Sequence, residues 1–266
     1  MKNSLEIERL DKLRVSLIEY NLIWEDAKAN QHYLDNLLNN HQTDIILLPE
    51  MFSSGFSMNV DKIAEKPFGN TFVWMQNKAK ELDTAIAGSI STKENEKYYN
   101  RFYFVSPTGS VFIYDKKHLF SYGKEATVYS AGDRIVTIDY KGWQIRPIVC
   151  YDLRFPVWIR NTEKNPYDLL LCVANWPKAR REVWIGLSKA RAIENMSYMA
   201  AVNRIGEDGY KLEYSGDSKM FDTLGKELKP INNHQEILQF EISKTEQNDT
   251  RKHFNFLEDR DQFYFG

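Results

Sequence analysis

Residues 44–50 read Asp44-Ile45-Ile46-Leu47-Leu48-Pro49-Glu50, an apolar run that is closed by a proline and a carboxylate. Four consecutive branched apolar residues are typical of a short strand buried on both faces. A strand covered on both faces belongs inside an α/β fold, where its carboxyl end opens onto a loop. The run therefore predicts a central strand that carries Glu50 to the edge of a sheet.

Two other apolar runs end in the same way. Lys116 follows Val111-Phe112-Ile113-Tyr114-Asp115, and Cys150 follows Ile145-Arg146-Pro147-Ile148-Val149. In α/β folds strand ends collect catalytic groups, because rigid elements there open onto loops and a cleft. The three runs together indicate a candidate catalytic set of Glu50, Lys116 and Cys150.

The rest of the chain supplies strands and helices around these runs. Apolar alternation and turn residues predict strands at 13–19, 45–48, 85–90, 98–106, 110–114, 135–140, 143–150, 167–174, 198–203, 215–222 and 236–241. Helical spacing predicts helices at 26–39, 71–82 and 180–195. No repeat, low-complexity tract or linker divides the chain, so residues 1–266 are expected to form one domain. Mixed βαβ units and hairpins favour sheets that are covered by helices on one face and packed on each other.

Composition limits the class of protein. The chain has 266 residues, of which 42% are hydrophobic, and its 35 basic and 37 acidic residues nearly cancel. That balance argues against a nucleic-acid partner, which normally requires a basic face. Basic residues do gather at 178–181, where we expect a helix start on a solvated surface.

Compartment is predicted from the N-terminus, the apolar runs and the cysteines. The first residues lack an apolar signal core, and the longest apolar runs are too short to cross a bilayer, so no membrane partner is expected. The only cysteines are Cys150 and Cys172, without the spacing of a disulfide scaffold or metal site. A cytoplasmic location is therefore expected.

A Cys–Glu–Lys set has a coherent chemistry. A free thiol has a pKa of about 8.5 and needs a base, which a carboxylate in an enclosed pocket can provide. A nearby ammonium favours the thiolate and stabilises an oxyanion. Each residue also has an ordinary interpretation: a buried small hydrophobe for the cysteine, as expected for Cys172, a turn carboxylate for Glu50 and a surface lysine for Lys116. His118 leaves open a Cys–His site or a simple turn anchor.

Three motifs resemble those of the nitrilase (carbon–nitrogen hydrolase) superfamily, in the family's order. They are Leu48-Pro49-Glu50-Met51-Phe52, Tyr114-Asp115-Lys116-Lys117-His118-Leu119-Phe120 and Val149-Cys150-Tyr151-Asp152-Leu153-Arg154-Phe155-Pro156. The resemblance covers nearly the whole chain, from Leu13 to about Arg251. It implies a four-layer α-β-β-α sandwich and a Glu–Lys–Cys triad.

Within the superfamily the chain is most similar to the bacterial omega-amidase branch. The segments that carry this closer resemblance are residues 50–56, Val173-Ala174-Asn175-Trp176-Pro177, Ala190-Arg191-Ala192-Ile193-Glu194-Asn195 and Gly216-Asp217-Ser218. The branch hydrolyses the terminal amide of short α-keto acid monoamides such as 2-oxoglutaramate and 2-oxosuccinamate. The alternatives are another amidase, nitrilase or N-carbamoyl hydrolase of the superfamily, and a non-catalytic binding protein on the same scaffold.

The resemblance also implies roles for single residues. Glu50 takes the proton of Cys150, the thiolate attacks the amide carbon, and the Lys116 ammonium with the backbone N–H of Tyr151 stabilises the oxyanion. Glu125 matches a second glutamate of the family that orients Lys116. No metal or organic cofactor is implied.

The substrate-binding residues are less determined by the sequence. Arg154 is a candidate for the substrate carboxylate, although it could instead pair with Asp152 or a helix end. Trp176 is expected to form a wall of the pocket. Family resemblance implies a homodimer, and the aromatic segment at about 253–266 is expected to be a docking tail.

Overall fold

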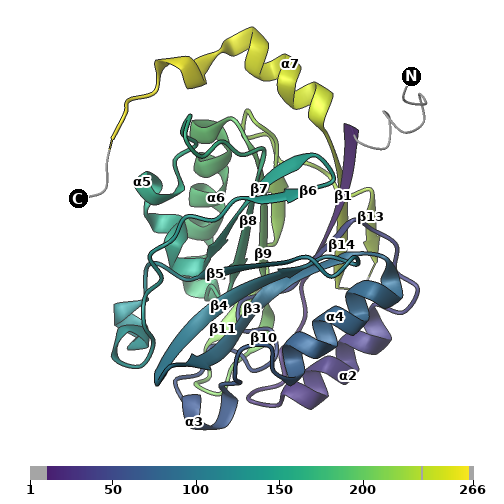
Figure 1. The fold of residues 1–266 in the computed structure, drawn as a ribbon, viewed down its shortest axis with the longest axis vertical. Coiled ribbons are helices and arrows are strands. Elements are labelled where there is room, and N and C mark those ends of the chain that lie inside the picture. Colours follow the sequence, from purple (N-terminus) through teal and green to yellow (C-terminus); the bar gives the residue numbers. More distant parts are fainter. Residues whose placement is uncertain (1–10, 235, 264–266) are drawn as a thin grey trace.

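Two β-sheets pack face to face and helices cover their outer faces, as the computed structural model shows for residues 11–234 and 236–263 (Figure 1). The seven-stranded sheet has the order β13-β14-β1-β2-β3-β4-β5, and the five-stranded sheet has the order β12-β9-β8-β7-β6. The expected four-layer α-β-β-α sandwich is confirmed.

The strands divide between the two sheets as follows. The strands of the large sheet are β1 (Lys12–Ile18), β2 (Ile45–Leu47), β3 (Ala85–Glu94), β4 (Lys97–Val105), β5 (Val111–Asp115), β13 (Asn232–His234) and β14 (Ile237–Ser243). Those of the small sheet are β6 (Ile138–Tyr140), β7 (Trp143–Val149), β8 (Leu169–Ala174), β9 (Tyr198–Asn203) and β12 (Lys219–Phe221), and a separate hairpin joins β10 (Ile205–Glu207) to β11 (Glu213–Ser215). The helices are α2 (Ala27–Leu37), α3 (Val60–Ile63), α4 (Asn70–Leu82), α5 (Pro156–Ile159), α6 (Arg181–Asn195) and α7 (Lys244–Phe254).

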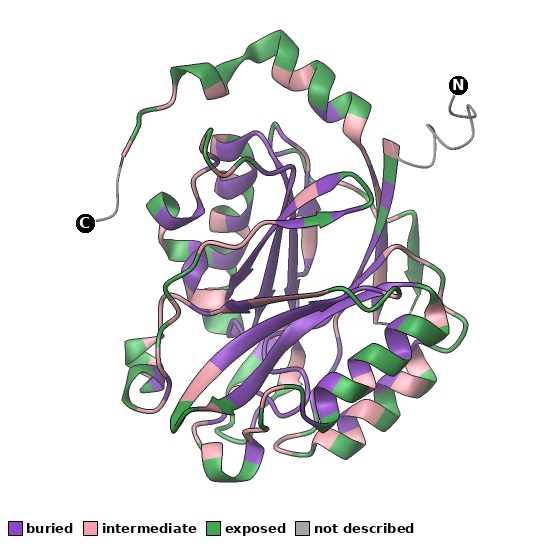
Figure 2. Cartoon of the chain, viewed as in Figure 1, coloured by how far each residue is buried: buried purple, intermediate pink, exposed green. Residues whose placement is uncertain are grey.

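Strand β8 shows why the central strands are continuous apolar runs. Leu169, Leu171 and Val173 face the core between the two sheets, whereas Leu170 and Cys172 face the core beneath α6. Every residue of β8 is buried, as in much of both sheets (Figure 2). Because successive side chains point to opposite faces, a strand between two cores must be apolar at every position. Cys172 is one of these core residues.

Helices α2 and α4 cover the outer face of the large sheet (Figure 1). Phe72, Met75 and Ala79 of α4 and Leu34 of α2 belong to the core between these helices and the sheet. Asp26 caps the start of α2, because its carboxylate accepts a hydrogen bond from the N–H of Ala29. The helical spacing in the sequence therefore identified both helices correctly.

The predicted strand at 215–222 is confirmed only in its second half, as β12, and is wrong in its first half. The chain there forms β11, a break and then β12. Gly216 has φ of +69° and Asp217 has φ of +60°, a left-handed conformation that no strand can continue through. The apolar alternation on both sides of the break concealed it, and only the Gly-Asp pair in the sequence marks it.

Helix α7 was not predicted, because it has almost no apolar face. Only Gln247 is buried in it, and the helix is held by polar contacts instead. Arg251 pairs with Asp168 at 2.9 Å, and Gln247 donates to the carbonyl oxygen of Asp168 at 2.7 Å. Periodicity detects a helix by its apolar stripe, so a helix anchored through polar groups gives no such signal.

The chain beyond α7 lies at the periphery of the sandwich (Figure 1). Phe254 and Phe256 are 40% and 55% exposed, and their rings stack at 5.3 Å. Residues 264–266, which belong to the predicted docking tail, lie outside the described residues. Within the described ranges, no helix has the length and hydropathy that crossing a bilayer requires.

Candidate active site

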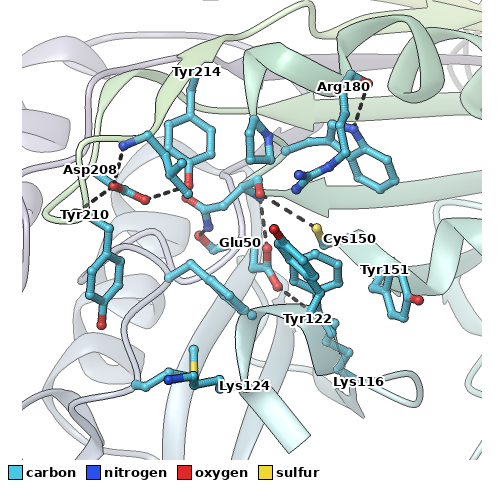
Figure 3. A pocket seen from close by; sticks show the side chains of 18 of the residues that line it. Glu50, Lys116, Tyr122, Lys124, Cys150, Tyr151, Arg180, Asp208, Tyr210 and Tyr214 are labelled. Atoms are coloured by element: carbon cyan, nitrogen blue, oxygen red, sulfur yellow. Dashed lines mark hydrogen bonds and ion pairs between the residues drawn. The ribbon is translucent and has the colours of Figure 1, made fainter.

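Glu50, Lys116 and Cys150 line one cavity of about 650 Å³ (Figure 3). Glu50 follows β2 and Lys116 follows β5, both in the large sheet, while Cys150 follows β7 in the small sheet. The cavity therefore lies where strand ends of both sheets meet. The structure brings together the three residues that the sequence analysis selected.

Lys116 is buried between two carboxylates. Its Nζ lies 2.9 Å from Glu50 Oε1 and 2.9 Å from Glu125 Oε2, and all three side chains are fully buried. Burial alone would lower the pKa of Lys116, but the carboxylates of Glu125 and Glu50 raise it well above its ordinary value. An ammonium in this environment stays charged at neutral pH, so it provides positive charge and does not act as a base.

Asn100, on β4, joins the same group and was missed in the sequence. Its Nδ2 donates to Glu50 Oε1 at 2.7 Å and to Glu125 Oε1 at 3.1 Å. The backbone carbonyl oxygen of Asn100 accepts a hydrogen bond from the backbone N–H of Lys116 at 3.0 Å. An asparagine is unfavourable in a strand, so this polar residue within an aromatic strand was the available signal.

Asn175 follows β8, the parallel neighbour of β7, and fixes the other side of Glu50. The backbone N–H of Asn175 donates to Glu50 Oε2 at 2.9 Å, and its Nδ2 donates to the Glu50 carbonyl oxygen at 2.6 Å. The thiol of Cys150 donates to the Asn175 carbonyl oxygen at 4.0 Å. Asn175 thus links the Glu50 carboxylate to the part of the cavity that holds the thiol.

Cys150 has a strained backbone and a protonated thiol at rest. Its φ of 45° lies in the left-handed region, at the point where β7 gives way to a short 3₁₀ helix, Cys150–Arg154. Burial raises the pKa of the thiol well above its ordinary value; the Glu50 carboxylate adds to this and Lys116 opposes it. The thiol therefore needs a base before it can act as a nucleophile.

Glu125 lies on the 3₁₀ helix Glu125–Thr127 and is held at its second oxygen by the backbone. The N–H of Phe120 donates to Glu125 Oε2 at 2.6 Å. Burial raises the pKa of Glu125, Lys116 opposes the rise, and the neighbouring Glu50 carboxylate adds to it. Glu125 therefore contacts Lys116 directly, in the position expected of a residue that orients the ammonium.

His118 is turned away from the nucleophile. Its backbone N–H and its Nδ1 both lie 2.8 Å from Asp152 Oδ1, and its ring stacks on Phe155 at 3.7 Å. It does not line the cavity. The structure therefore gives His118 the place of a turn anchor and not that of a base for Cys150. Asp152 also accepts hydrogen bonds from Tyr114 and from the N–H of Val149, and among the described residues Arg154 is not one of its partners.

The residues expected to contact substrate do line the cavity. The guanidinium of Arg154 lies over the ring of Trp176, with 5.2 Å to the centroid, and Tyr151 also lines the cavity. Arg180 also lines the cavity, and Trp176 Nε1 donates to its carbonyl oxygen at 3.0 Å. The helix start expected at 178–181 is confirmed, and Lys178 and Arg181 are exposed, whereas Arg180 is half-buried and lines the cavity.

No group of His, Cys, Asp and Glu side chains within the described ranges is arranged to hold a metal ion. At the nucleophile the structure brings together the thiol of Cys150, the ammonium of Lys116 and the carboxylates of Glu50 and Glu125. These groups suit the attack of a nucleophile on a polarised carbonyl carbon.

Comparison with known proteins points to the same chemistry. The family model "Carbon-nitrogen hydrolase" matches residues 14–252. The omega-amidase YafV of Escherichia coli K12 is 41% identical over 94% of this chain and 98% of its own length. The 2-oxoglutaramate amidase of Bacillus subtilis is 28% identical over 93% of this chain and 97% of its own length. Among solved structures, XC1258 from Xanthomonas campestris, a CN-hydrolase superfamily protein with an arsenic adduct in its active site, superposes with a TM-score of 0.92. It is 41% identical and covers 96% of this chain and 99% of its own.

Proposed function

The chain belongs to the carbon-nitrogen hydrolase family, and from that premise we propose that it is an omega-amidase. It hydrolyses the terminal amide of short α-keto acid monoamides, such as 2-oxoglutaramate and 2-oxosuccinamate, to the dicarboxylate and ammonia. The similarity to curated omega-amidases along nearly the whole chain supports this substrate class. The observation that carries the chemistry is the buried ammonium of Lys116 between Glu50 and Glu125, beside the thiol of Cys150.

In the first half of the proposed reaction Cys150 is the nucleophile and Glu50 is its base. The raised pKa of the thiol keeps it protonated until Glu50 removes the proton. The thiolate then attacks the amide carbon, and the carbonyl oxygen gains negative charge. Lys116 and the backbone N–H of Tyr151 stabilise that oxyanion, because preorganised donors act strongly in a buried site.

Ammonia leaves next, taking the proton that Glu50 received. The acyl group remains on Cys150 as a thioester. Glu50 then removes a proton from water, and the resulting hydroxide attacks the thioester carbon. The C–S bond breaks, the acid product is released and ionises to the carboxylate, and the Cys150 thiolate takes the proton back from Glu50. Three groups hold the Glu50 carboxylate during both halves: Lys116, Asn100 and the backbone N–H of Asn175.

Ammonia release from 2-oxoglutaramate tests the proposal directly. Wild type and Cys172→Ala should both hydrolyse this amide, whereas Cys150→Ala should be folded and inactive. Cys172 is the matched control because it is the chain's other cysteine and lies in the core beneath α6. Glutamine and a simple nitrile serve as control substrates. If the wild type prefers either of them, the chain is a different amidase or nitrilase of the same family. Failure of the wild type on all three would favour a non-catalytic binding protein.

We further propose that the protein works in the cytoplasm as a homodimer. Both cysteines are free, which suits a reducing compartment. The stacked, exposed rings of Phe254 and Phe256 are an apolar surface of the kind that is covered in an assembly. Light scattering coupled to size exclusion should give a dimer mass for the wild type and a lower mass for Phe254→Ser/Phe256→Ser. A monomeric wild type would refute the proposal.

A further inference from the structure

We propose that Arg180, supported by Arg154, binds the carboxylate of the substrate and makes the enzyme select amides that carry a negative charge at the far end. The inference rests on the proposed omega-amidase function and identifies the residues that recognise its substrate class.

Both guanidinium groups are presented on aromatic faces within the cavity. Arg180 lies over the ring of Phe120 at 5.5 Å, and Arg154 lies over the ring of Trp176 at 5.2 Å. The backbone of Arg180 is fixed as well, since its N–H donates to Pro177 at 2.9 Å and its carbonyl oxygen accepts from Trp176. An arginine that stacks on a ring keeps its N–H edge available, and that edge matches a carboxylate with two parallel hydrogen bonds.

The positive charges of Arg154 and Arg180 distinguish these arginines from the neighbouring cations. Among the residues that the structure describes, no carboxylate forms an ion pair with Arg154 or Arg180. The next residue is different, because Arg181 pairs with Asp217 at 2.5 Å and with Glu182 at 2.9 Å. The third cation of the cavity wall, Lys116, is already balanced by two carboxylates. Two unpaired arginines in one cavity therefore favour an anionic ligand.

Arg180 lies on the side of the cavity that holds the nucleophile (Figure 3). In Figure 3 Arg180 lies on the same side of Glu50 as Cys150 and Tyr151, whereas Asp208 lies on the opposite side. The amide carbon and the carboxylate carbon of 2-oxoglutaramate are four bonds apart, about 5 Å in the extended form. A cavity of about 650 Å³ is much larger than this ligand, so a charged anchor is needed to hold the amide against the thiol.

Lys124 is the remaining cation of the cavity wall, and its environment is less suitable for binding the substrate carboxylate. It is exposed in a left-handed turn, with φ of 61°, and among the described residues no aromatic ring lies under its ammonium. A flexible, strongly hydrated ammonium on the rim gives neither two parallel hydrogen bonds nor a fixed position.

Arg180→Gln tests the inference, with Arg181→Gln as the matched control one residue away. On 2-oxoglutaramate Arg180→Gln should raise KM by roughly 10- to 100-fold with a smaller effect on kcat, because the lost hydrogen bonds are charged and remote from the reacting carbon. On pentanamide, an uncharged amide of the same length, it should equal the wild type. Arg154→Gln should raise KM for the charged amide less strongly. Arg181→Gln should leave both activities unchanged.

A binding measurement separates this inference from the proposed function. Calorimetric titration with pentanoate reports on the carboxylate subsite without turnover, and Arg180→Gln should weaken its affinity by roughly 10-fold or more. If the wild type binds pentanoate through Arg180 but does not hydrolyse 2-oxoglutaramate, the proposed function fails and the subsite stands. If Arg180→Gln keeps the wild-type KM and the wild-type affinity for pentanoate, the assignment of Arg180 is overturned.

Discussion

Lys116→Met is expected to destabilise the protein far more than a surface lysine substitution would. The change removes the ammonium between Glu50 and Glu125 and leaves two buried carboxylates side by side. Breaking a buried ion pair by removal of one partner costs about 3–5 kcal/mol. For a chain of this size that loss lowers the melting temperature by roughly 6–20 °C.

The pH dependence of the loss follows from the shifted pKa values. In the wild type the pKa of Lys116 is raised by folding, so its stabilisation is complete below the unfolded value of about 10.4 and is lost only as pH rises through the folded value. In the variant Glu125 loses the ammonium that opposes the rise of its pKa, while burial and the Glu50 carboxylate continue to raise it. The resulting penalty is absent below the unfolded pKa of about 4.3 and complete above the raised folded pKa of Glu125. The variant should therefore be closer to the wild type at pH 5 than at pH 8.

Urea unfolding at pH 5 and pH 8 measures the loss of stability in Lys116→Met and its dependence on pH. Lys117→Met is the matched control. Lys117 is the next residue, and its ammonium lies over Trp158 at 5.2 Å without a carboxylate partner among the described side chains. Its loss should cost under about 1 kcal/mol at either pH. Equal destabilisation by the two variants, or a Lys116→Met penalty that does not change with pH, would refute the reasoning.

Three other outcomes are expected from the site. Glu50→Gln should lower kcat on 2-oxoglutaramate by roughly 100- to 10,000-fold with KM little changed, because a general base is lost. Steady-state ammonia release measures both constants, and a wild-type kcat in this variant would contradict the role of Glu50. Asn100→Leu removes the donor shared by Glu50 and Glu125, so kcat should fall by roughly 10-fold at constant KM, and an unaltered kcat would show that the donor is dispensable. Iodoacetamide should label Cys150 slowly at pH 7 and faster as pH rises above 8, because burial raises the pKa of the thiol and its thiolate fraction grows only there. Mass spectrometry locates the label, and a rate already at its maximum at pH 7 would mean that the thiolate is present at rest.

Much of the fold could be predicted from the sequence because the central strands are buried on both faces. Residues 45–48 and strand β8 are continuous apolar runs for this reason, and the first run also identifies the strand end that carries Glu50. Helix α4 was predictable because its apolar residues share one face. These strands and this helix can be predicted from local sequence, because each pattern depends only on the environment of one element.

The partners within the site were decided by the tertiary structure. Asn100 is 50 residues from Glu50 in the chain, and Asn175 is 125 residues from it, yet both donate to its carboxylate. Arg180 belongs to a basic cluster whose other members are exposed or paired at the surface, and nothing in its local sequence separates it from Arg181. Local sequence does not indicate which strand ends will meet when two sheets pack together. The sequence alone therefore determined the strands and the reactive residues at their ends, and the packing of the two sheets decided which polar groups surround them.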